Sequence, residues 1–165
     1  TRRPPTLQWF DFHALMEDVF RLGQLAVKES GAQFEARFGR RTAEVLVDTI
    51  QIQQVLLNLL VNAAEAVQDR PSPAIRLRSW SDSSESIIIA VEDSGTGVPI
   101  EAGRDLFAPF QSTKAEGVGI GLSICRSIME AHGGQIWCDN ESTLGGARFL
   151  LSLPRRDVQG TNHAA

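Results

Sequence analysis

The hydrophobic positions of the chain follow two spacings, and each spacing predicts one kind of secondary structure. Apolar residues recur at three- and four-residue steps within residues 12–22, 50–69 and 119–132, which predicts helices. Apolar runs bounded by turn residues predict strands at 33–38, 44–47, 74–80, 86–92, 135–139 and 147–153. Asp11 stands where it can cap the first helix, and Gly133-Gly134 follows the last one. Helices grouped with hairpin-forming strands predict an α+β two-layer sandwich, in which a mostly antiparallel sheet packs on the helices.

One predicted helix, residues 50–69, carries polar side chains along a single narrow face. It is otherwise apolar nearly all round, which predicts a buried helix. The polar residues recur at three- and four-residue steps and are Gln51, Gln54, Asn58, Asn62, Glu65 and Asp69. A solvated face is the plain interpretation, but such a face more usually carries Lys, Glu or Gln than Asn. Amide oxygens one turn apart, as in Asn58 and Asn62, can hold a hard cation such as Mg²⁺.

The strand predicted at 86–92 runs directly into a carboxylate followed by spaced glycines, Asp93-Ser94-Gly95-Thr96-Gly97-Val98. Glycines let a backbone approach a flat ligand closely. An ionised Asp93 would accept a hydrogen bond from an exocyclic amino group such as adenine N6. It would repel the carbonyl that guanine presents at the same place. A plain Asp-Gly turn is the alternative interpretation of this loop.

A second glycine-rich loop, Gly117-Val118-Gly119-Ile120-Gly121-Leu122, opens the last predicted helix. Free N–H groups at a helix start favour anions, and phosphates above all. The spacing matches neither the dinucleotide-binding pattern nor the P-loop. The stretch between the two glycine-rich loops has no clear secondary-structure pattern, which is typical of a functional lid. Phe107 and Phe110 could anchor such a lid, and Lys114 could reach a phosphate.

Composition and charge fit one globular domain and narrow its possible partners. The 165 residues, 42% of them hydrophobic and 22% charged, are ordinary for a single folded domain. We expect residues 8–154 to form it, with a linker remnant at 1–7 and a flexible tail at 155–165. The net charge of −4 argues against a nucleic-acid partner, and the apolar runs fall short of the about 18 residues that span a bilayer. Cys125 and Cys138 lie in apolar segments, which favours reduced core thiols in a cytosolic protein over a disulfide.

Taken in order, the spaced residues resemble the N, G1, F and G2 boxes of sensor histidine kinases. The matching groups are Asn58-x-x-x-Asn62, Asp93-x-Gly95-x-Gly97, Phe107-x-x-Phe110 and Gly117-x-Gly119-x-Gly121, flanked by Ala131-His132-Gly133-Gly134 and Gly145-Gly146-Ala147-Arg148-Phe149. Over residues 8–154 the chain resembles the ATP-binding catalytic domain of these kinases, in the superfamily shared with gyrase, Hsp90 and MutL. The resemblance implies a Bergerat-type ATP-binding fold with an ATP lid.

The resemblance also assigns roles to these residues. Asn62 would ligate the Mg²⁺ that bridges the ATP phosphates, and Asn58 would support the metal or its waters. Asp93 would bind the adenine amino group, the two Phe residues would hinge the lid, and the last three glycines would let the backbone pass close to the phosphates. A phosphate contact from Lys114 is a hypothesis from its charge and position. The expected nucleotide contacts are Asn58, Asn62, Asp93, Gly95, Gly97, Val98, Phe107, Phe110, Lys114, Gly117, Val118, Gly119, Ile120, Gly121 and Leu122.

Two positions depart from the pattern of many such kinases. Glu65 stands where many of them place a Lys that touches phosphate. Glu occurs there in the branch of oxygen-sensing and nitrogen-regulatory kinases, which this chain resembles. Ala147 replaces a Thr found in many relatives, which puts a hydroxyl contact near the nucleotide in doubt.

The resemblance implies that the domain binds Mg·ATP and donates the γ-phosphate to a His on a separate dimerisation domain, for relay to an Asp of a response regulator. His13, His132 and His163 do not lie in the sequence setting of a phosphoacceptor. We therefore expect a fragment that begins just after the dimerisation helices. Such a domain would be monomeric and cytoplasmic, with membrane tethering of the whole protein left open.

Two other functions stay as alternatives. ATPases of the same superfamily carry a water-activating Glu four residues before the metal-binding Asn. This chain has Asn58 at that position, and an amide takes no proton at neutral pH, which argues against an ATPase. A nucleotide-binding module that keeps the fold without the chemistry is the second alternative.

Overall fold

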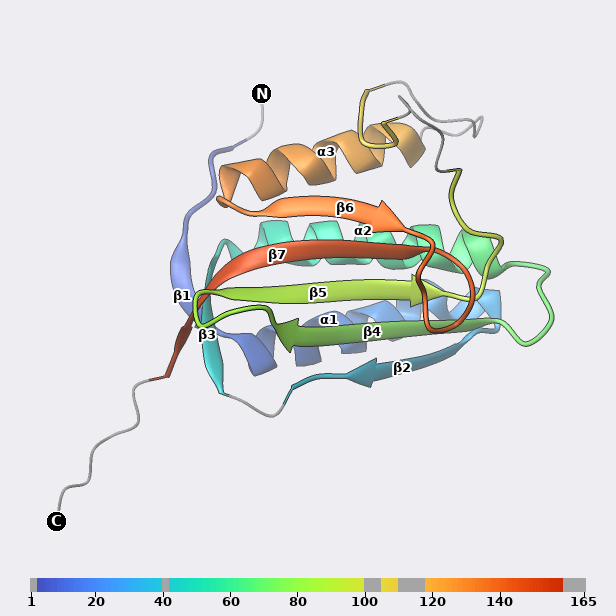
Figure 1. Ribbon diagram of the computed structural model, residues 1–165, viewed down its shortest axis with the longest axis horizontal. Coiled ribbons are helices and arrows are strands. Elements are labelled where there is room, and N and C mark those ends of the chain that lie inside the picture. Colours follow the sequence, from blue (N-terminus) through green and yellow to red (C-terminus); the bar gives the residue numbers. More distant parts are fainter. Residues whose placement is uncertain (1–2, 40–41, 100–104, 110–117, 159–165) are drawn as a thin grey trace, which may run out of the picture.

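The computed structural model describes residues 3–39, 42–99, 105–109 and 118–158 of the chain (Figure 1). The predicted helices and strands are all present in it. The elements in chain order are β1 Gln8–Asp11, α1 Phe12–Val27, the short 3-10 helix η1 Lys28–Ser30, β2 Gln33–Arg37, β3 Ala43–Val47, α2 Thr49–Val67, β4 Ala74–Ser81, β5 Ser86–Asp93, α3 Val118–Ala131, β6 Gln135–Asp139 and β7 Arg148–Asp157. Within the described ranges, no helix is long and apolar enough to cross a membrane.

The strands form one sheet in the order β1-β3-β7-β5-β4-β2, with β6 paired to β7. Every neighbouring pair is antiparallel except β2 and β4, which are parallel. One continuous core joins all three α-helices to a single face of this sheet. In Figure 1, α1 and α2 lie behind β7, β5 and β4, and α3 runs beside β6. The predicted α+β two-layer sandwich with a mostly antiparallel sheet is confirmed.

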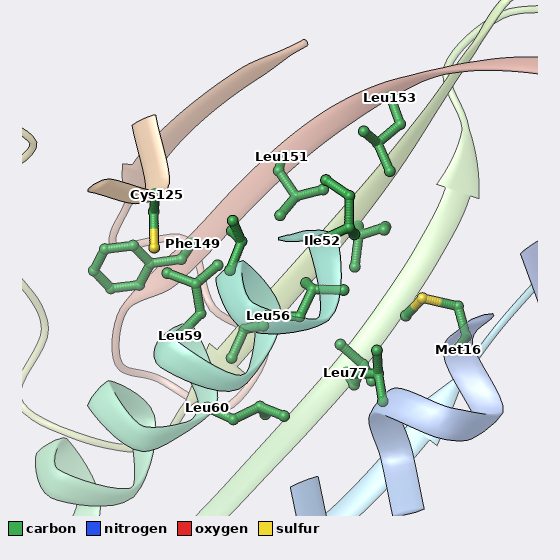
Figure 2. Packing of buried hydrophobic residues seen from close by; sticks show 14 of the residues in the cluster. Met16, Ile52, Leu56, Leu59, Leu60, Leu77, Cys125, Phe149, Leu151 and Leu153 are labelled. Atoms are coloured by element: carbon green, nitrogen blue, oxygen red, sulfur yellow. The ribbon is translucent and has the colours of Figure 1, made fainter. Parts of the chain in front are cut away.

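Helix α2 forms the centre of the core. Figure 2 shows its Leu56 and Leu59 in one cluster with Leu151 of β7, Met16 of α1 and Cys125 of α3. Both leucines and Leu151 are fully buried. Burial of each such side chain stabilises the fold by about 1.5–3 kcal/mol. The packing therefore fixes α2, and with it the polar face, relative to β5.

The start of α1 and the end of α3 are closed as the sequence predicts, and the structure adds a cap at the start of α2. Oδ1 of Asp11 accepts a hydrogen bond from the backbone N–H of Ala14 at 2.8 Å and caps α1. Asp48 caps α2 in the same way, with Gln51 N–H as the donor at 3.3 Å. Gly133, with φ of 71°, turns the chain in the left-handed region after α3.

The expected flexible tail at 155–165 is wrong at its start, because β7 continues to Asp157. Its last three residues pair with Ala43, Glu44 and Val45 of β3. The Arg155 side chain is buried, and its Nη1 donates to the carbonyl of Ser83 at 3.0 Å. The partner strand is remote in sequence, so the polar composition of this segment hides the pairing. Residues 159–165 lie outside the described residues.

The expected linker remnant at 1–7 contacts the domain in its described part. Arg3 Nη2 and the Thr6 N–H each donate to Oδ2 of Asp48 at 3.0 Å. Burial acts to raise the pKa of Asp48, but the N–H groups of Thr6 and Gln51 and the Arg3 guanidinium together hold that pKa below its ordinary value. Strand β1, which the apolar spacing does not predict, follows directly and pairs with β3.

Candidate functional site

The end of β5, the second half of α2 and the start of α3 lie at the same end of the molecule, on the right in Figure 1. The loop after β5 packs directly on α2. A Cβ atom at Gly95 would lie 2.6 Å from the carbonyl oxygen of Ala66. Asn62 precedes Ala66 by one helical turn on α2. The carboxylate loop and the pair of asparagines are therefore neighbours, as the resemblance implies.

Asp93, the last residue of β5, is buried with its carboxylate held by backbone donors. Its Oδ1 accepts hydrogen bonds from Gly95 N–H at 2.9 Å and Ala147 N–H at 3.1 Å. Burial raises the pKa of Asp93, and these two donors offset only part of that effect. Oδ2 accepts no hydrogen bond from the part of the chain that the structure describes. The site thus presents one fixed, buried acceptor oxygen to a ligand that carries a donor.

Gly95 and Gly146 lie so close to other atoms of the protein that a side chain would not fit at either position. A Cβ atom at Gly146 would lie 2.4 Å from Asp93 Oδ1, and the Gly146 N–H donates to the Asp93 carbonyl at 3.0 Å. The sequence suggests that Gly95 lets backbone approach a flat ligand, but the atom nearest to it is the Ala66 carbonyl. A side chain at either glycine would push the loop off α2 or off Asp93.

The loop after Asp93 is held from the other side by the β6–β7 connection. Gly97 has φ of 87°, in the left-handed region, and is followed by Val98. Val98 N–H donates to Asn140 Oδ1 at 2.8 Å, and Asn140 Nδ2 donates to the Val98 carbonyl at 2.7 Å. The predicted site residues Gly97 and Val98 therefore belong to one braced loop with Asp93 and Gly95.

The polar residues of α2 differ in their burial along the helix. Gln51 is buried and donates to the Arg3 carbonyl at 3.0 Å, whereas Gln54 is exposed. Asn58 and Asn62 are half-buried, and Asn58 Nδ2 donates to Cys125 Sγ of α3 at 3.7 Å. A purely solvated face does not account for the two asparagines. Among the described residues, no three His, Cys, Asp or Glu side chains are grouped to hold a metal ion, so a cation here would depend on amide and ligand oxygens.

Phe107 anchors the beginning of the segment expected to form a lid. The ring is buried and lies edge-on to Phe149 of β7, with the ring centroids 6.2 Å apart. Asp105 Oδ1 accepts from the Phe107 N–H at 3.0 Å, and its Oδ2 pairs with Arg126 of α3 at 2.6 Å. The hydrogen bond from Arg126 holds the pKa of Asp105 below its ordinary value.

The structure describes only some of the remaining residues that are predicted to contact the nucleotide. Leu122 is buried in the core, which makes it a packing residue of α3 and does not place it against a ligand. Gly121 lies in the first turns of α3, where a Cβ atom would meet no described atom within 4 Å. Phe110, Lys114 and Gly117 lie outside the described residues. Val118, Gly119 and Ile120 begin helix α3, and their side chains also lie outside the described part.

Residues 47–157 match the protein family described as histidine kinase-, DNA gyrase B-, and HSP90-like ATPases. The chain belongs to this family. Known structures agree, since the catalytic domain of histidine kinase ThkA superposes with a TM-score of 0.77 at 32% identity and covers 90% of this chain and 95% of that one. The family and the fold of this histidine kinase ATP-binding domain thus match those that its boxes imply.

Relatives in sequence are sensor histidine kinases several times longer than this domain. The chain is 34% identical over 156 residues to sensor histidine kinase TmoS of Ectopseudomonas mendocina. This alignment covers 93% of this chain and 16% of TmoS. The chain is also 37% identical over 143 residues to sensor protein FixL of Bradyrhizobium diazoefficiens, in an alignment that covers 87% of this chain and 28% of FixL. The chain therefore spans less than a third of these relatives.

The structure adds site residues that the sequence patterns miss, all from the β6–β7 connection. Ser142 Oγ donates to the Asp93 carbonyl at 2.8 Å, and Thr143 Oγ1 donates to Glu92 at 2.8 Å. Together with Asn140 they hold the end of β5 and the loop that follows it. No fixed spacing links them to Asp93. The pair Gly145-Gly146 is the one local signal that two backbones approach closely here.

Proposed function

We propose that this domain binds Mg·ATP and donates its γ-phosphate to a histidine on a separate dimerisation domain, for relay to an aspartate of a response regulator. The observation that carries the proposal is the buried Asp93 carboxylate, whose Oδ2 is left by the described residues as an acceptor. Adenine N6 is a donor that fits this oxygen, whereas the guanine carbonyl oxygen would be repelled by the ionised carboxylate.

The asparagines of α2 suit the phosphate end of the same ligand. Asn58 donates through Nδ2 to Cys125, which leaves its Oδ1 as an acceptor for a metal-bound water. Asn62, one turn further along and half-buried, would supply an oxygen to Mg²⁺. When bound, the metal neutralises charge on the phosphates, which is the main requirement of phosphoryl transfer. The first turn of α3 would offer its N–H groups to the same phosphates.

Transfer to a separate protein group is favoured over hydrolysis or transfer within this chain. Asn58 cannot act as the base that activates water. The His13 imidazole is paired with Glu17 on the surface, and both ring nitrogens of His132 are used inside the protein. Neither described histidine is thus placed to attack a bound γ-phosphate, and His163 lies outside the described residues. We infer that the acceptor histidine belongs to a domain that precedes this one.

The relatives support the proposed partners. Histidine kinase ThkA, at 29% identity and a TM-score of 0.73, has been solved in complex with response regulator protein TrrA. In a whole kinase, the domain would work in the cytoplasm, bind no nucleic acid and dimerise through the preceding helices while remaining monomeric alone.

Calorimetric titration of the chain with Mg·ATP, Mg·GTP and ATP in EDTA tests the binding part of the proposal. We expect saturable binding that prefers adenine and weakens without the metal. Incubation with γ-labelled ATP then tests transfer: the chain alone should stay unlabelled, and addition of a dimerisation domain from a related kinase should place label on that domain's histidine. Label on this chain by itself would overturn the assignment of the acceptor.

A further inference from the structure

Asn140 makes a reciprocal pair of hydrogen bonds with the backbone of Val98. Its side-chain oxygen accepts from Val98 N–H at 2.8 Å, and its side-chain nitrogen donates to the Val98 carbonyl at 2.7 Å. One amide thus satisfies both polar groups of a residue 42 positions away in sequence. Asn140 is exposed and directly follows β6, outside all four nucleotide boxes.

The first half of the loop that Asn140 contacts is held to β4, since Ser94 N–H donates to the Ala74 carbonyl at 3.1 Å and Ala74 N–H donates to Ser94 Oγ at 2.9 Å. Asn140 therefore acts on the second half of the loop, around Gly97 and Val98. Gly97 lies in the left-handed region, and glycine is the residue that loses most freedom when a chain is ordered. A Cβ atom at Gly97 would lie 2.7 Å from Asn140 Oδ1, so the glycine and the amide occupy adjoining space. The absence of a side chain at Gly97 lets Asn140 reach the Val98 backbone.

The same β6–β7 connection also contacts Asp93. Ser142 Oγ and Gly146 N–H both donate to the Asp93 carbonyl, at 2.8 and 3.0 Å, and Ala147 N–H donates to Asp93 Oδ1 at 3.1 Å. One end of the loop, at Asp93, and the other, at Val98, are therefore fixed by a single segment. Between them, Gly95 packs on α2 at the Ala66 carbonyl, and Gly97 packs on the Asn140 side chain.

We propose that Asn140 is a positioning residue for base recognition, which holds the loop from Asp93 to Val98 in its binding-competent shape before nucleotide arrives. The inference rests on the proposed function, in which Asp93 receives the adenine amino group. A loop ordered in advance does not have to be ordered by the ligand, so the affinity for the base is higher. Asn140 itself need not touch the nucleotide.

The role makes a specific prediction about which part of the ligand is affected. Loss of the brace should weaken binding of the adenine end and leave the metal dependence of the phosphate end unchanged. It should also depend on Asp93, because the brace acts through the loop that aims that carboxylate. Two residues that act as one unit give non-additive effects in a double-mutant cycle.

The test compares Asn140→Ala, Asn140→Asp and the neighbouring control Glu141→Gln by calorimetry with Mg·ATP and with ATP in EDTA. Removal of both hydrogen bonds should raise the Kd for ATP about five- to tenfold. The aspartate keeps an acceptor for Val98 N–H, but its second oxygen replaces the donor and would repel the Val98 carbonyl, so its Kd should be raised at least as much as that of the alanine variant. Glu141 is largely exposed and pairs with Arg148 away from Val98, so its variant should bind ATP as the parent chain does.

Amide hydrogen exchange measured without nucleotide provides a readout that does not depend on ATP. In Asn140→Ala, the Val98 amide should exchange faster while the amides of β5 and β7 keep their protection. The Asn140→Ala effect on ATP affinity should also shrink when it is introduced into Asp93→Asn. A general loss of stability would instead speed exchange throughout and add to the effect of Asp93→Asn.

The outcomes separate the two proposals. If the parent chain binds no ATP, the proposed function fails, and base positioning fails with it. If the parent chain binds ATP and Asn140→Ala binds it equally well, the role of Asn140 is overturned while the proposed function stands. Equal loss of ATP affinity in Asn140→Ala and Glu141→Gln would also overturn the role, since it would point to the whole connection and not to this amide.

Discussion

The backbone N–H of Asp48 donates to Nε2 of His132 at 3.1 Å, which joins the start of α2 to the end of α3. Nδ1 of the same ring lies 2.8 Å from the Ile128 carbonyl. With Nε2 as acceptor, Nδ1 must be the donor, so the imidazole is the neutral tautomer that carries its proton on Nδ1. The ring is 2% exposed. The two helices that carry the asparagines and the G2 glycines are thus connected through one buried side chain.

His132→Ala should destabilise the domain by about 2–4 kcal/mol, because it leaves the buried Asp48 N–H unpaired and opens a cavity. Urea unfolding followed by tryptophan fluorescence measures the change, as a lower midpoint with an unchanged slope. His13→Ala is the matched control, since the His13 side chain is 63% exposed, pairs with Glu17 at the surface and otherwise lies edge-on to Phe38 with ring centroids 6.4 Å apart. Its midpoint should hardly move. If His13→Ala lowered the urea midpoint as much as His132→Ala does, the buried hydrogen bonds of His132 would contribute no more stability than a surface contact.

Asp93→Asn should reverse the base preference of the site. The Gly95 and Ala147 N–H groups require an oxygen at Oδ1, which forces the new amide nitrogen into the place of Oδ2. Two donors would then face each other at adenine N6, and the affinity for ATP should fall by about 3 kcal/mol, or roughly 100-fold. Titration with ATP, GTP and ITP measures the change. GTP and ITP, which present a carbonyl there, should lose little or gain, and an unchanged ATP-to-GTP ratio would contradict the role of Asp93.

The same substitution should not destabilise the fold. Burial raises the folded-state pKa of Asp93, so this carboxyl contributes stability that is fully present below its unfolded pKa and is lost as the pH rises through its folded pKa. Above the folded-state pKa the ionised carboxylate destabilises the fold, and the neutral amide removes that cost. Thermal unfolding at pH 7 should give a Tm for Asp93→Asn at or above that of the parent chain, and the advantage should vanish on acidification. A lower Tm at pH 7 would mean that the ionised carboxylate stabilises the fold.

The sequence predicts well those features whose signal is local. The spacing of apolar residues finds α2, and Asp11 and Gly133 mark helix ends by their own backbone chemistry. Asp93 is found because it follows a buried strand and precedes two spaced glycines. Each of these patterns lies within a few residues of the feature it predicts.

Features built from distant segments are not predicted. The end of β7 depends on pairing with β3, more than a hundred residues earlier, as in the Glu44–Arg156 contact. Asn140 has no sequence relationship to Val98 that would reveal their hydrogen bonds. For the same reason Gly95 is assigned to a ligand, although its nearest neighbour is the Ala66 carbonyl. Which distant segments pair depends on the fold as a whole, and the spacing of residues within either segment does not name its partner.

The two cysteines should be inert toward thiol reagents in the folded protein. Neither cysteine forms a disulfide, Cys125 is fully buried, and burial together with the charges of Asp139 and Asp105 raises the pKa of Cys138 to about 11. At pH 8 only about one thiol in a thousand would be thiolate at such a pKa. Iodoacetamide followed by mass spectrometry should therefore label neither residue in buffer and both in urea. Rapid labelling of Cys138 in buffer would show that β6 opens readily.

Asn62→Ala should remove the effect of Mg²⁺ on nucleotide binding while the metal-free affinity stays unchanged. The reason is that the substitution removes the half-buried side-chain oxygen of Asn62 that would bind the metal, whereas the loop from Asp93 to Val98 remains intact. The affinity for ATP in excess Mg²⁺ should drop by about tenfold or more, to the level measured in EDTA. Gln54→Ala is the matched control, because Gln54 lies two turns earlier on the same polar face and is exposed. A control variant that loses the metal effect equally would assign it to the whole face of α2, and an unchanged Asn62→Ala would move the metal site off this helix.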